Sequence, residues 1–459
     1  MIPARLQALL EAVQPVAEAF EAAGQRLYLV GGVVRDQFVG RDHAERSDID
    51  LTTDALPDRI KAIVAPLADS VWTQGERFGT IGCQVSGRAL EITTHRAEAY
   101  LPESRKPDVR FSTAVEADLS RRDFTVNAMA LALPEPRLID PFDGMSDLAA
   151  GRLRTPLSPD ESFTDDPLRM LRAARFIAGY GLQPDPELTE AVRRNVARME
   201  IVSAERIRDE LDKLLVVPDP SAGLWFVVET GLADQFLPEL PAMRLEQDPI
   251  HHHKDVLAHT IAVVAKTNPD RIVRLAALLH DVGKPKTRSI THEGVTFHHH
   301  EVVGARMARD RMQALRYSND DVEAVRQLVF QHLRFHTYGL GWTDSAVRRF
   351  VRDAGPRRDQ LIELTRCDCT TRNRRKAEML SRRMDELVAR IAELEKREEL
   401  AAIRPDLDGR QVMEQLGVPP GPVVGRALDF LLELRLEEGP LGEAEARRRL
   451  AEWWAGQPG

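Results

Sequence analysis

The chain has 459 residues, 43% of them hydrophobic and 29% charged, and this length predicts two to four folded domains. No stretch approaches about 18 consecutive apolar residues, so we expect no membrane-spanning helix. Three cysteines are too few for a disulfide framework, which favours a reducing cytoplasm. The formal net charge of −9 counts mildly against a chain that binds nucleic acid, although one basic segment departs from this average.

Residues 1–150 have the pattern of a domain with both helices and strands. The first part of this segment repeats leucine, valine and phenylalanine at helical spacing, which predicts an amphipathic helix and not a signal peptide. A second helix is expected over 33–39, and Ser86-Gly87-Arg88 predicts a hairpin turn. The expected strands are residues 27–30, 49–53, 80–85, 89–94, 126–133 and 137–139.

Helical patterns dominate after Pro156, where strand signals almost vanish. The proline-rich stretch 238–249 is the best candidate for a linker. We therefore predict an α+β fold in which a mixed-sheet head precedes three all-α parts. The expected parts are a head over 1–150, a neck over 151–240, a third domain over 241–385 and a tail over 386–459.

Two carboxylates, Asp48 and Asp50, stand two residues apart at the strand expected over 49–53. Because side chains at this spacing point to the same face of a strand, the two carboxylates aim together. Such a pair suits Mg²⁺, which prefers one or two protein carboxylates beside phosphate oxygens and water, and two ions could activate a hydroxyl and stabilise a leaving pyrophosphate. A solvated strand end is the alternative. Glu91 is a candidate third carboxylate, although strand alternation could equally leave it in solvent.

Gly31 and Gly32 lie where the first expected strand passes into a helix. Glycine lets the backbone approach a ligand closely, and a helix N-terminus offers free amide groups to a triphosphate. An isolated pair of glycines is usually an ordinary turn. The order strand, Gly-Gly, helix and Asp-x-Asp within a short span is much more specific than any one of these features.

A family resemblance rests on this order of features. The segment resembles the signature of class II tRNA nucleotidyltransferases and bacterial poly(A) polymerases, here Leu29-Val-Gly-Gly-Val-Val-Arg-Asp36 with Asp48-Ile-Asp50. Four later segments resemble the family's ribose motif, head–neck hinge, base-selecting motif and last motif, namely Arg121–Met129, Asp140–Leu148, Asp165–Phe176 and Ser203–Ile207. The motifs cover about the first half of the chain. One departure is Asp165, where the family usually has glutamate.

The resemblance implies a polymerase-β-like nucleotidyltransferase head that adds C, C and A to the 3′ end of tRNA from CTP and ATP, with Mg²⁺. Poly(A) polymerases and partial enzymes that add only CC or only A share these motifs, so both stay open. The implied catalytic residues are Asp48, Asp50 and Glu91. The implied nucleotide-binding residues are Gly31, Gly32, Arg35, Arg121, Arg122, Asp123, Asn127, Asp166, Arg169, Arg172 and Arg175.

Base selection is implied for Asp166 and Arg169, which stand three residues apart on an expected helix and so share a face. An acceptor carboxylate and a donor guanidinium could read the Watson–Crick edges of C and A. The alternative is that Asp166 merely caps the helix, with Pro167 at its first position.

A second set of metal-ligand residue types lies in the third domain. Imidazole suits transition metals and carboxylate suits Mg²⁺ or Mn²⁺, so a mixed site is plausible. The set resembles the HD superfamily of phosphohydrolases, which implies one metal ion held by His259, His280, Asp281 and Asp368, with His300 and His332 added in two-metal members. A reading of another class, an HD hydrolase or nucleotide sensor whose head only binds, is disfavoured by the Asp-x-Asp pair. We expect His251–His253 to be surface or linker residues and Cys367 and Cys369 to be helix neighbours.

Between Arg348 and Arg383 the chain has 12 lysines and arginines against 5 acidic residues. We expect this segment to hold the body of tRNA, and a solvated helical face is the alternative. Glycines in the tail could also bring helix amides to an RNA phosphate, although an ordinary Pro/Gly loop fits equally well. The candidate RNA contacts are Arg372, Arg374, Arg375, Lys376, Gly421 and Gly425. The expected partners are tRNA, CTP and ATP, with no membrane and no obligate protein partner.

Overall fold

The chain divides into two compact units, Met1–Pro238 and Glu239–Gly459. The division falls close to the predicted end of the neck. The computed structural model describes residues 4–40, 49–99, 108–245, 255–292, 294–337, 341–369, 374–398, 400 and 403–457.

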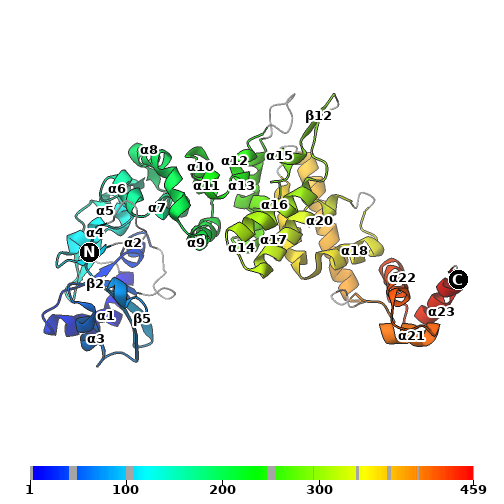
Figure 1. Ribbon diagram of the computed structural model, residues 1–459, viewed down its shortest axis with the longest axis horizontal. Helices are drawn as coiled ribbons and strands as arrows, with labels where there is room; N and C mark the ends of the chain where they lie inside the picture. Colours follow the sequence, from blue (N-terminus) through cyan, green and yellow to red (C-terminus); the bar gives the residue numbers. More distant parts are fainter. Residues whose placement is uncertain are drawn as a thin grey trace. The chain divides into compact units, whose positions relative to one another are not determined.

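The first unit is built on a seven-stranded mixed sheet with the order β3-β4-β5-β2-β1-β8-β9 (Figure 1). β2 and β5 run parallel, whereas the other neighbours are antiparallel. The strands are β1 (Leu27–Val30), β2 (Ile49–Thr53), β3 (Ser70–Trp72), β4 (Thr80–Val85), β5 (Arg88–Thr94), β8 (Ala130–Leu133) and β9 (Arg137–Ile139). The mixed-sheet head that the sequence predicts is therefore confirmed.

Apolar side chains hold three helices against this sheet, namely α1 (Ala4–Ala22), α2 (Gly32–Phe38) and α3 (Pro57–Val64). The helical repeat in α1 gathers residues such as Val13 and Phe20 on one face, and these are fully buried with Leu29 and Ile92 of the sheet. Burying this surface stabilises the head and fixes the ends of β1 and β2, where the candidate site lies.

One predicted strand is shorter than expected. Residues Thr125–Asn127 form a 3-10 turn, so only Ala130–Leu133 of the predicted 126–133 is a strand. Two hydrogen bonds of Asn127 hold this turn. Its side-chain Nδ2 donates to Asp123 Oδ1 at 2.8 Å, and its backbone N–H donates to the carbonyl oxygen of Phe124. A small sheet of β6 (Arg96–Ala99) and β7 (Asp108–Phe111) was not predicted.

Helices make up most of the rest of the first unit. They are α4 (Val115–Ser120), α5 (Gly144–Ala150), α6 (Pro159–Asp165), α7 (Leu168–Tyr180), α8 (Pro186–Asn195), α9 (Ala204–Leu215), α10 (Ser221–Glu229) and α11 (Ala233–Phe236). α7 packs against α9 and α10, so the base-selecting motif lies on the central helix of the neck.

The described residues of the second unit form helices and one small hairpin of β12 (Ser289–Thr291) and β13 (Gly294–Thr296). Its main helices are α13 (Val256–Lys266), α14 (Arg271–Leu279), α16 (His300–Ala314), α17 (Asn319–Gln331), α18 (Asp344–Ala354), α19 (Arg358–Asp368), α20 (Arg374–Glu395), α21 (Gly409–Leu416), α22 (Pro422–Glu438) and α23 (Glu443–Ala455). The predicted boundary between 385 and 386 falls inside α20, which continues for a further ten residues to Glu395. None of the helices described has the length and apolar character needed to cross a membrane.

Candidate functional site

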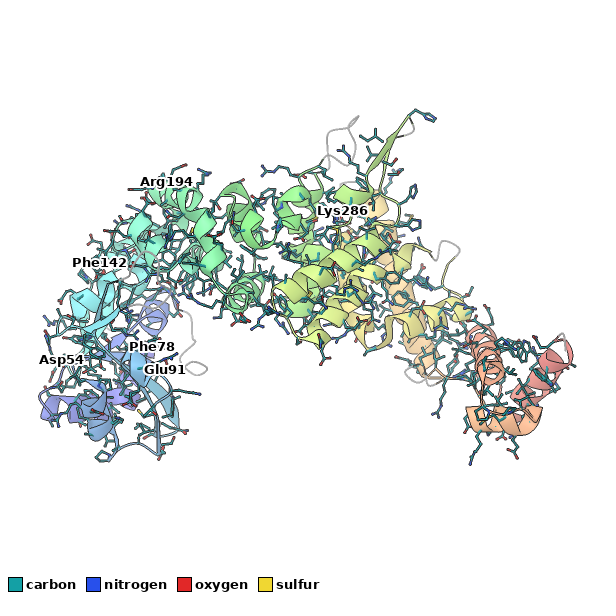
Figure 2. The ribbon with its side chains drawn as sticks, viewed as in Figure 1. Asp54, Phe78, Glu91, Phe142, Arg194 and Lys286 are labelled. Atoms are coloured by element: carbon teal, nitrogen blue, oxygen red, sulfur yellow. The ribbon has the colours of Figure 1, made fainter. Side chains whose placement is uncertain are left out.

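Two carboxylates lie side by side at the sheet of the head. The parallel register of β2 and β5 pairs Asp50 with Glu91, so both side chains point to the same face. Asp50 is exposed, whereas its neighbours Ile49 and Leu51 are buried and fix the strand. Figure 2 shows Glu91 among the strands of the first unit. Asp48 lies outside the described residues.

The glycine turn adjoins these carboxylates. Gly31 has φ of +80°, a conformation that favours glycine, and it precedes α2. A Cβ atom placed on Gly31 would lie 3.5 Å from Asp50 Oδ2 and 3.3 Å from Arg122 Nη1. Acidic oxygens, a close-approach turn and a guanidinium therefore meet at one place. This donor set fits a divalent cation beside a phosphate chain.

The predicted ribose motif is organised around a buried carboxylate. Asp123 accepts hydrogen bonds from Asn127 Nδ2 at 2.8 Å and from Arg172 Nε at 2.9 Å. Burial would raise the pKa of Asp123, but the charge of Arg172 and the hydrogen bonds from Asn127 and Arg172 lower this pKa below its usual range. Arg175 pairs with Glu210, which is also buried. Glu210 was not predicted, although it lies on α9 only three residues after the last motif, which ends at Ile207.

Arg35 has several partners inside the first unit. It is 5% exposed, and its guanidinium donates to Asp36, Asn127 and the hydroxyl of Tyr180. It also lies over the Tyr180 ring, with the guanidinium carbon 4.2 Å from the ring centroid. Arg35 thus links α2 to α7 inside the protein, and its contact with a nucleotide stays a prediction.

The base-selecting pair also differs from its expected arrangement. Asp166 precedes α7 rather than lying within it, and its Oδ1 accepts from the amide of Leu168 at 3.2 Å. Arg206 of α9 donates to Asp166 Oδ2 at 2.7 Å. Arg169 has other partners than Asp166, because its guanidinium donates to the hydroxyl of Ser162 and to the backbone oxygen of Arg121. Asp166 therefore accepts from the first turn of α7, although Pro167 and not Asp166 is the N-cap residue of this helix. The sequence had not pointed to Arg206 as a partner of Asp166.

Six predicted ligands of the second unit come together in one centre. These residues form two groups, and the candidate ligand atoms within each group lie within 4.8 Å of one another. The first group is His259, His280 and Asp368, and the second group is Asp281, His300 and His332. Asp281 joins them, because its Oδ2 lies 3.2 Å from His280 Nε2 and its Oδ1 lies 3.4 Å from His300 Nε2. The first-metal set implied by the sequence included Asp281, whereas the structure places this carboxylate between both groups.

The orientation of the imidazoles fits metal binding. Nδ1 of His280, of His300 and of His332 each lies 2.6 to 2.8 Å from a backbone carbonyl oxygen three residues earlier. A carbonyl oxygen can only accept, so Nδ1 carries the proton and Nε2 is left with a lone pair that faces the centre. Lys284, which was not predicted, donates to Asp281 Oδ2 at 2.7 Å.

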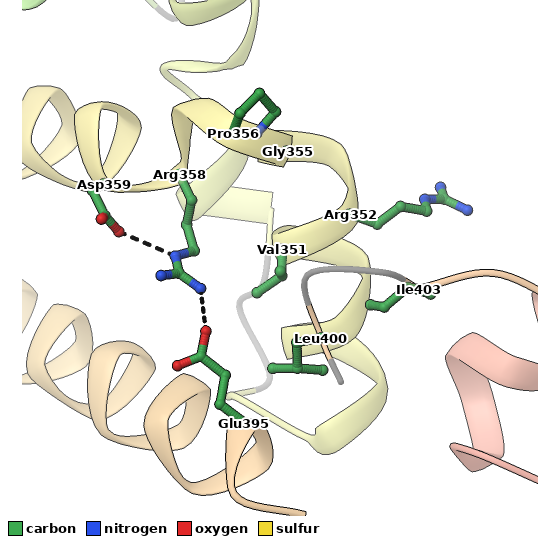
Figure 3. A pocket seen from close by; sticks show the side chains of 9 residues that line it. All are labelled: Val351, Arg352, Gly355, Pro356, Arg358, Asp359, Glu395, Leu400 and Ile403. Carbon is green, nitrogen blue, oxygen red and sulfur yellow. Dashed lines mark hydrogen bonds and ion pairs between the residues drawn. The ribbon is translucent and has the colours of Figure 1, made fainter. Parts of the chain in front are cut away.

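Several arginines of the predicted basic segment pair with acidic residues. Arg348 is buried and pairs with Glu398. Figure 3 shows Arg358 between Asp359 and Glu395 at a cavity of about 490 Å³. Other pairs are Arg349 with Glu433 and Glu437, Arg352 with Asp353, and Arg366 with Asp385. Several of these carboxylates, namely Asp385, Glu395, Glu398, Glu433 and Glu437, lie outside the segment used for the charge count, so the pairs lower its local excess of positive charge. The contact of this segment with tRNA stays a prediction.

The remaining candidate RNA contacts are placed only in part. Arg375 is exposed on α20, on which Arg374 and Lys376 also lie, whereas Arg372 and His251–His253 lie outside the described residues. Gly421 is the N-cap of α22, and Gly425 lies in its first turn, with open space where a Cβ atom would be. Their contact with RNA stays a prediction.

Family models match three consecutive parts of the chain. They are the poly A polymerase head domain over residues 27–154, a probable RNA and SrmB-binding site of polymerase A over 181–243, and the HD domain over 251–394. The CCA-adding enzyme of Bacillus stearothermophilus, solved in complex with CTP, shares the fold with a TM-score of 0.67 and 24% identity, covering 97% of this chain and 98% of that one.

Two relatives match different lengths of the chain. The CCA-adding enzyme of Limosilactobacillus reuteri is 39% identical over 237 residues, which cover 51% of this chain and 57% of that enzyme. The A-adding tRNA nucleotidyltransferase of Deinococcus radiodurans is 34% identical over 446 residues, which cover 93% of this chain and 95% of that enzyme. Because this second similarity runs almost the whole length of both proteins, the chain belongs to the class II tRNA nucleotidyltransferase and poly(A) polymerase family, with a C-terminal HD domain.

Proposed function

We propose that the chain adds C, C and A to the 3′ end of tRNA, using CTP and ATP and releasing pyrophosphate. The observation that carries this proposal is the meeting of Asp50, Glu91, the Gly31 turn and Arg122 at one place on the head. Relatives named CCA-adding enzymes match about half of the chain.

The residues of the head divide the chemistry between them. Mg²⁺ ions held by Asp48, Asp50 and Glu91 would activate the 3′ hydroxyl of the RNA and neutralise charge on the reacting phosphate. The turn at Gly31 brings backbone amides to the triphosphate, and Arg122 neutralises its charge. Asp166 and Arg169 select the base after the contacts with Arg206 and Ser162 rearrange.

The test is incorporation of labelled CTP and ATP by the purified protein on tRNA that lacks its CCA end. We expect C to be added first and A to follow, and we expect Asp50→Asn to abolish both. Absence of any nucleotide addition in the presence of Mg²⁺ would reject the proposal.

A second candidate is a partial enzyme that adds only the terminal A. It is favoured by the D. radiodurans relative, which is named for A addition and matches the chain almost throughout. The two candidates differ in their acceptors, because an A-adding enzyme leaves tRNA without a CCA end unchanged and extends tRNA that already ends in CC. Supplying both acceptors separately decides between them.

We also propose that the second unit hydrolyses phosphoesters with a divalent ion, either Mg²⁺ or a transition metal, held by the two groups around Asp281. The test is hydrolysis of bis(p-nitrophenyl) phosphate with Mg²⁺, Mn²⁺ or Ni²⁺, which Asp281→Asn should abolish. A cytoplasmic location is consistent with the free cysteines Cys83, Cys367 and Cys369 and is part of this proposal.

A further inference from the structure

One buried carboxylate holds the two arginines that begin the ribose motif. Asp118 of α4 is 1% exposed. Its Oδ1 accepts from Arg121 Nε at 3.1 Å and from Arg121 Nη2 at 3.0 Å, and its Oδ2 accepts from Arg122 Nη2 at 3.2 Å. The contacts arise because Asp118 precedes these arginines by three and four residues, the spacing that brings side chains together on a helix.

The two terminal nitrogens of the Arg122 guanidinium have different surroundings. Its Nη2 is bound by Asp118, whereas its Nη1 lies 3.3 Å from the position that a Cβ on Gly31 would occupy. Asp50 Oδ2 lies 3.5 Å from the same position. The pairing with Asp118 therefore sets the direction in which the guanidinium reaches the glycine turn.

The bonding of Arg122 is incomplete among the described residues. Its Nε is buried and has no hydrogen-bond partner there. A buried donor without a partner is uncommon in folded proteins. The other end of the same guanidinium, Nη1, lies near the Gly31 turn, where a phosphate oxygen is the acceptor whose charge suits it best.

We propose that Asp118 is a positioning residue that orients Arg122 for the triphosphate of the incoming nucleotide; this rests on the proposed function of the head. Asp118 does not touch the nucleotide. Without its charge, two adjacent arginines that are each about one-fifth exposed would repel one another and turn toward water. Binding a triphosphate would then require both side chains to be ordered again, which lowers affinity.

The experiment measures binding of CTP and of inorganic triphosphate by calorimetry, with Asp118→Asn compared with the unaltered protein. We expect the affinity for both probes to fall at least tenfold, with an unchanged ratio of CTP to UTP affinity. The ratio is preserved because Arg169 donates to the backbone oxygen of Arg121, which the substitution leaves in place. Affinities within twofold of the unaltered protein would overturn the proposal.

Two further variants separate positioning from stability. Glu398→Gln is the matched control, because Glu398 is also a buried carboxylate between two arginines, Arg348 and Arg435, but lies in the second unit. It should leave CTP affinity unchanged. Asp118→Asn in an Arg122→Ala background should weaken CTP binding by less than threefold, because Asp118 acts through Arg122. A full tenfold effect in that background would contradict the proposed route.

A folding defect would not leave the proposal undecided. If thermal melting shows that Asp118→Asn does not fold, Asp118→Glu is tested in its place. This variant keeps the negative charge but displaces both arginines, so it should weaken triphosphate binding. Unchanged binding would overturn the proposal.

Failure of the proposed function gives a different result. If the unaltered protein binds CTP but adds no nucleotide, the proposed function is rejected while the binding test of Asp118 remains valid. If the unaltered protein binds neither CTP nor inorganic triphosphate, the proposed function and the role of Asp118 are both rejected.

Discussion

Asp50 of β2 lies directly beside Glu91 of β5, in the parallel pair at the centre of the head sheet. The two residues come from strands that are far apart in sequence, and the strand register brings their carboxylates to one face. This register places Glu91 where it could share a cation with Asp50. The alternation of side chains within one strand could not predict this pairing.

Substitution of either carboxylate should slow nucleotide addition without unfolding the head. We expect Asp50→Asn and Glu91→Gln each to lower kcat by roughly a hundredfold or more, because charge that stabilises the transition state is lost. Single-turnover addition of CMP, with a thermal melt of each variant, checks this. Asp54→Asn is the control, since Asp54 follows β2 and pairs with Arg26 at 2.7 Å. Near-normal addition by Glu91→Gln would remove Glu91 from the metal site.

Base selection should depend on the Asp166 carboxylate and not on its contact with Arg206. Asp166→Ala should relax discrimination against UTP and GTP more than it slows CMP transfer, because unpaired groups no longer reject the wrong base. Arg206→Ala keeps the Asp166 carboxylate and should retain the preference for CTP and ATP. Incorporation of all four nucleotides by both variants provides the measurement. If Asp166→Ala keeps full discrimination, Asp166 is a helix cap and no more.

Contacts with tRNA should depend on α20 rather than on the paired arginines before it. Replacing Arg374 and Arg375 with glutamate should raise KM for tRNA and flatten its salt dependence, while KM for ATP stays constant. Arg349→Glu is the comparison, because Arg349 already pairs with Glu433 and Glu437. A titration of tRNA at several salt concentrations tests this, and equal effects of both changes would argue against a specific RNA surface on α20.

Metal removal should affect the second unit and the head independently. His332→Ala removes one Nε2 ligand from the group around Asp281 and should lower phosphodiester hydrolysis by at least tenfold. Nucleotide addition by the same variant should stay normal, because the ligands of the head are unaltered. The two activities are measured on one preparation after dialysis against a chelator and return of Mn²⁺ or Mg²⁺. Hydrolysis that survives in His332→Ala would place the reaction elsewhere.

Local patterns predicted the features that depend on neighbouring residues. The hairpin of β4 and β5 was expected from Ser86 and Gly87, and the strand before Gly31 was expected from an apolar run. Residues Thr125–Asn127 were wrongly assigned to a strand because the hydrogen bond between Asn127 and Asp123 outweighs the apolar pattern. The three-residue strands β3, β12 and β13 are too short to produce a clear alternation.

Long-range pairs explain why the site was predicted only in part. The motif spacing identified Asp123 and Arg172 separately, but the sequence does not reveal that they form an ion pair. Likewise, the partners that neutralise Arg349 lie in α22, so a local charge count overestimated the basic surface. The six candidate ligands of the second unit were predicted by resemblance and lie together in the structure, whereas the position of Asp281 beside both His280 and His300 required the folded structure.

The most direct test of the central claim is to sequence the 3′ ends of tRNA after reaction with the purified protein, Mg²⁺, CTP and ATP. The acceptor is tRNA that ends before its CCA. The account predicts that the products end in CCA and that ATP alone gives no extension to that end. Products that carry a run of A, or an acceptor that stays unchanged while tRNA ending in CC gains one A, would contradict CCA addition.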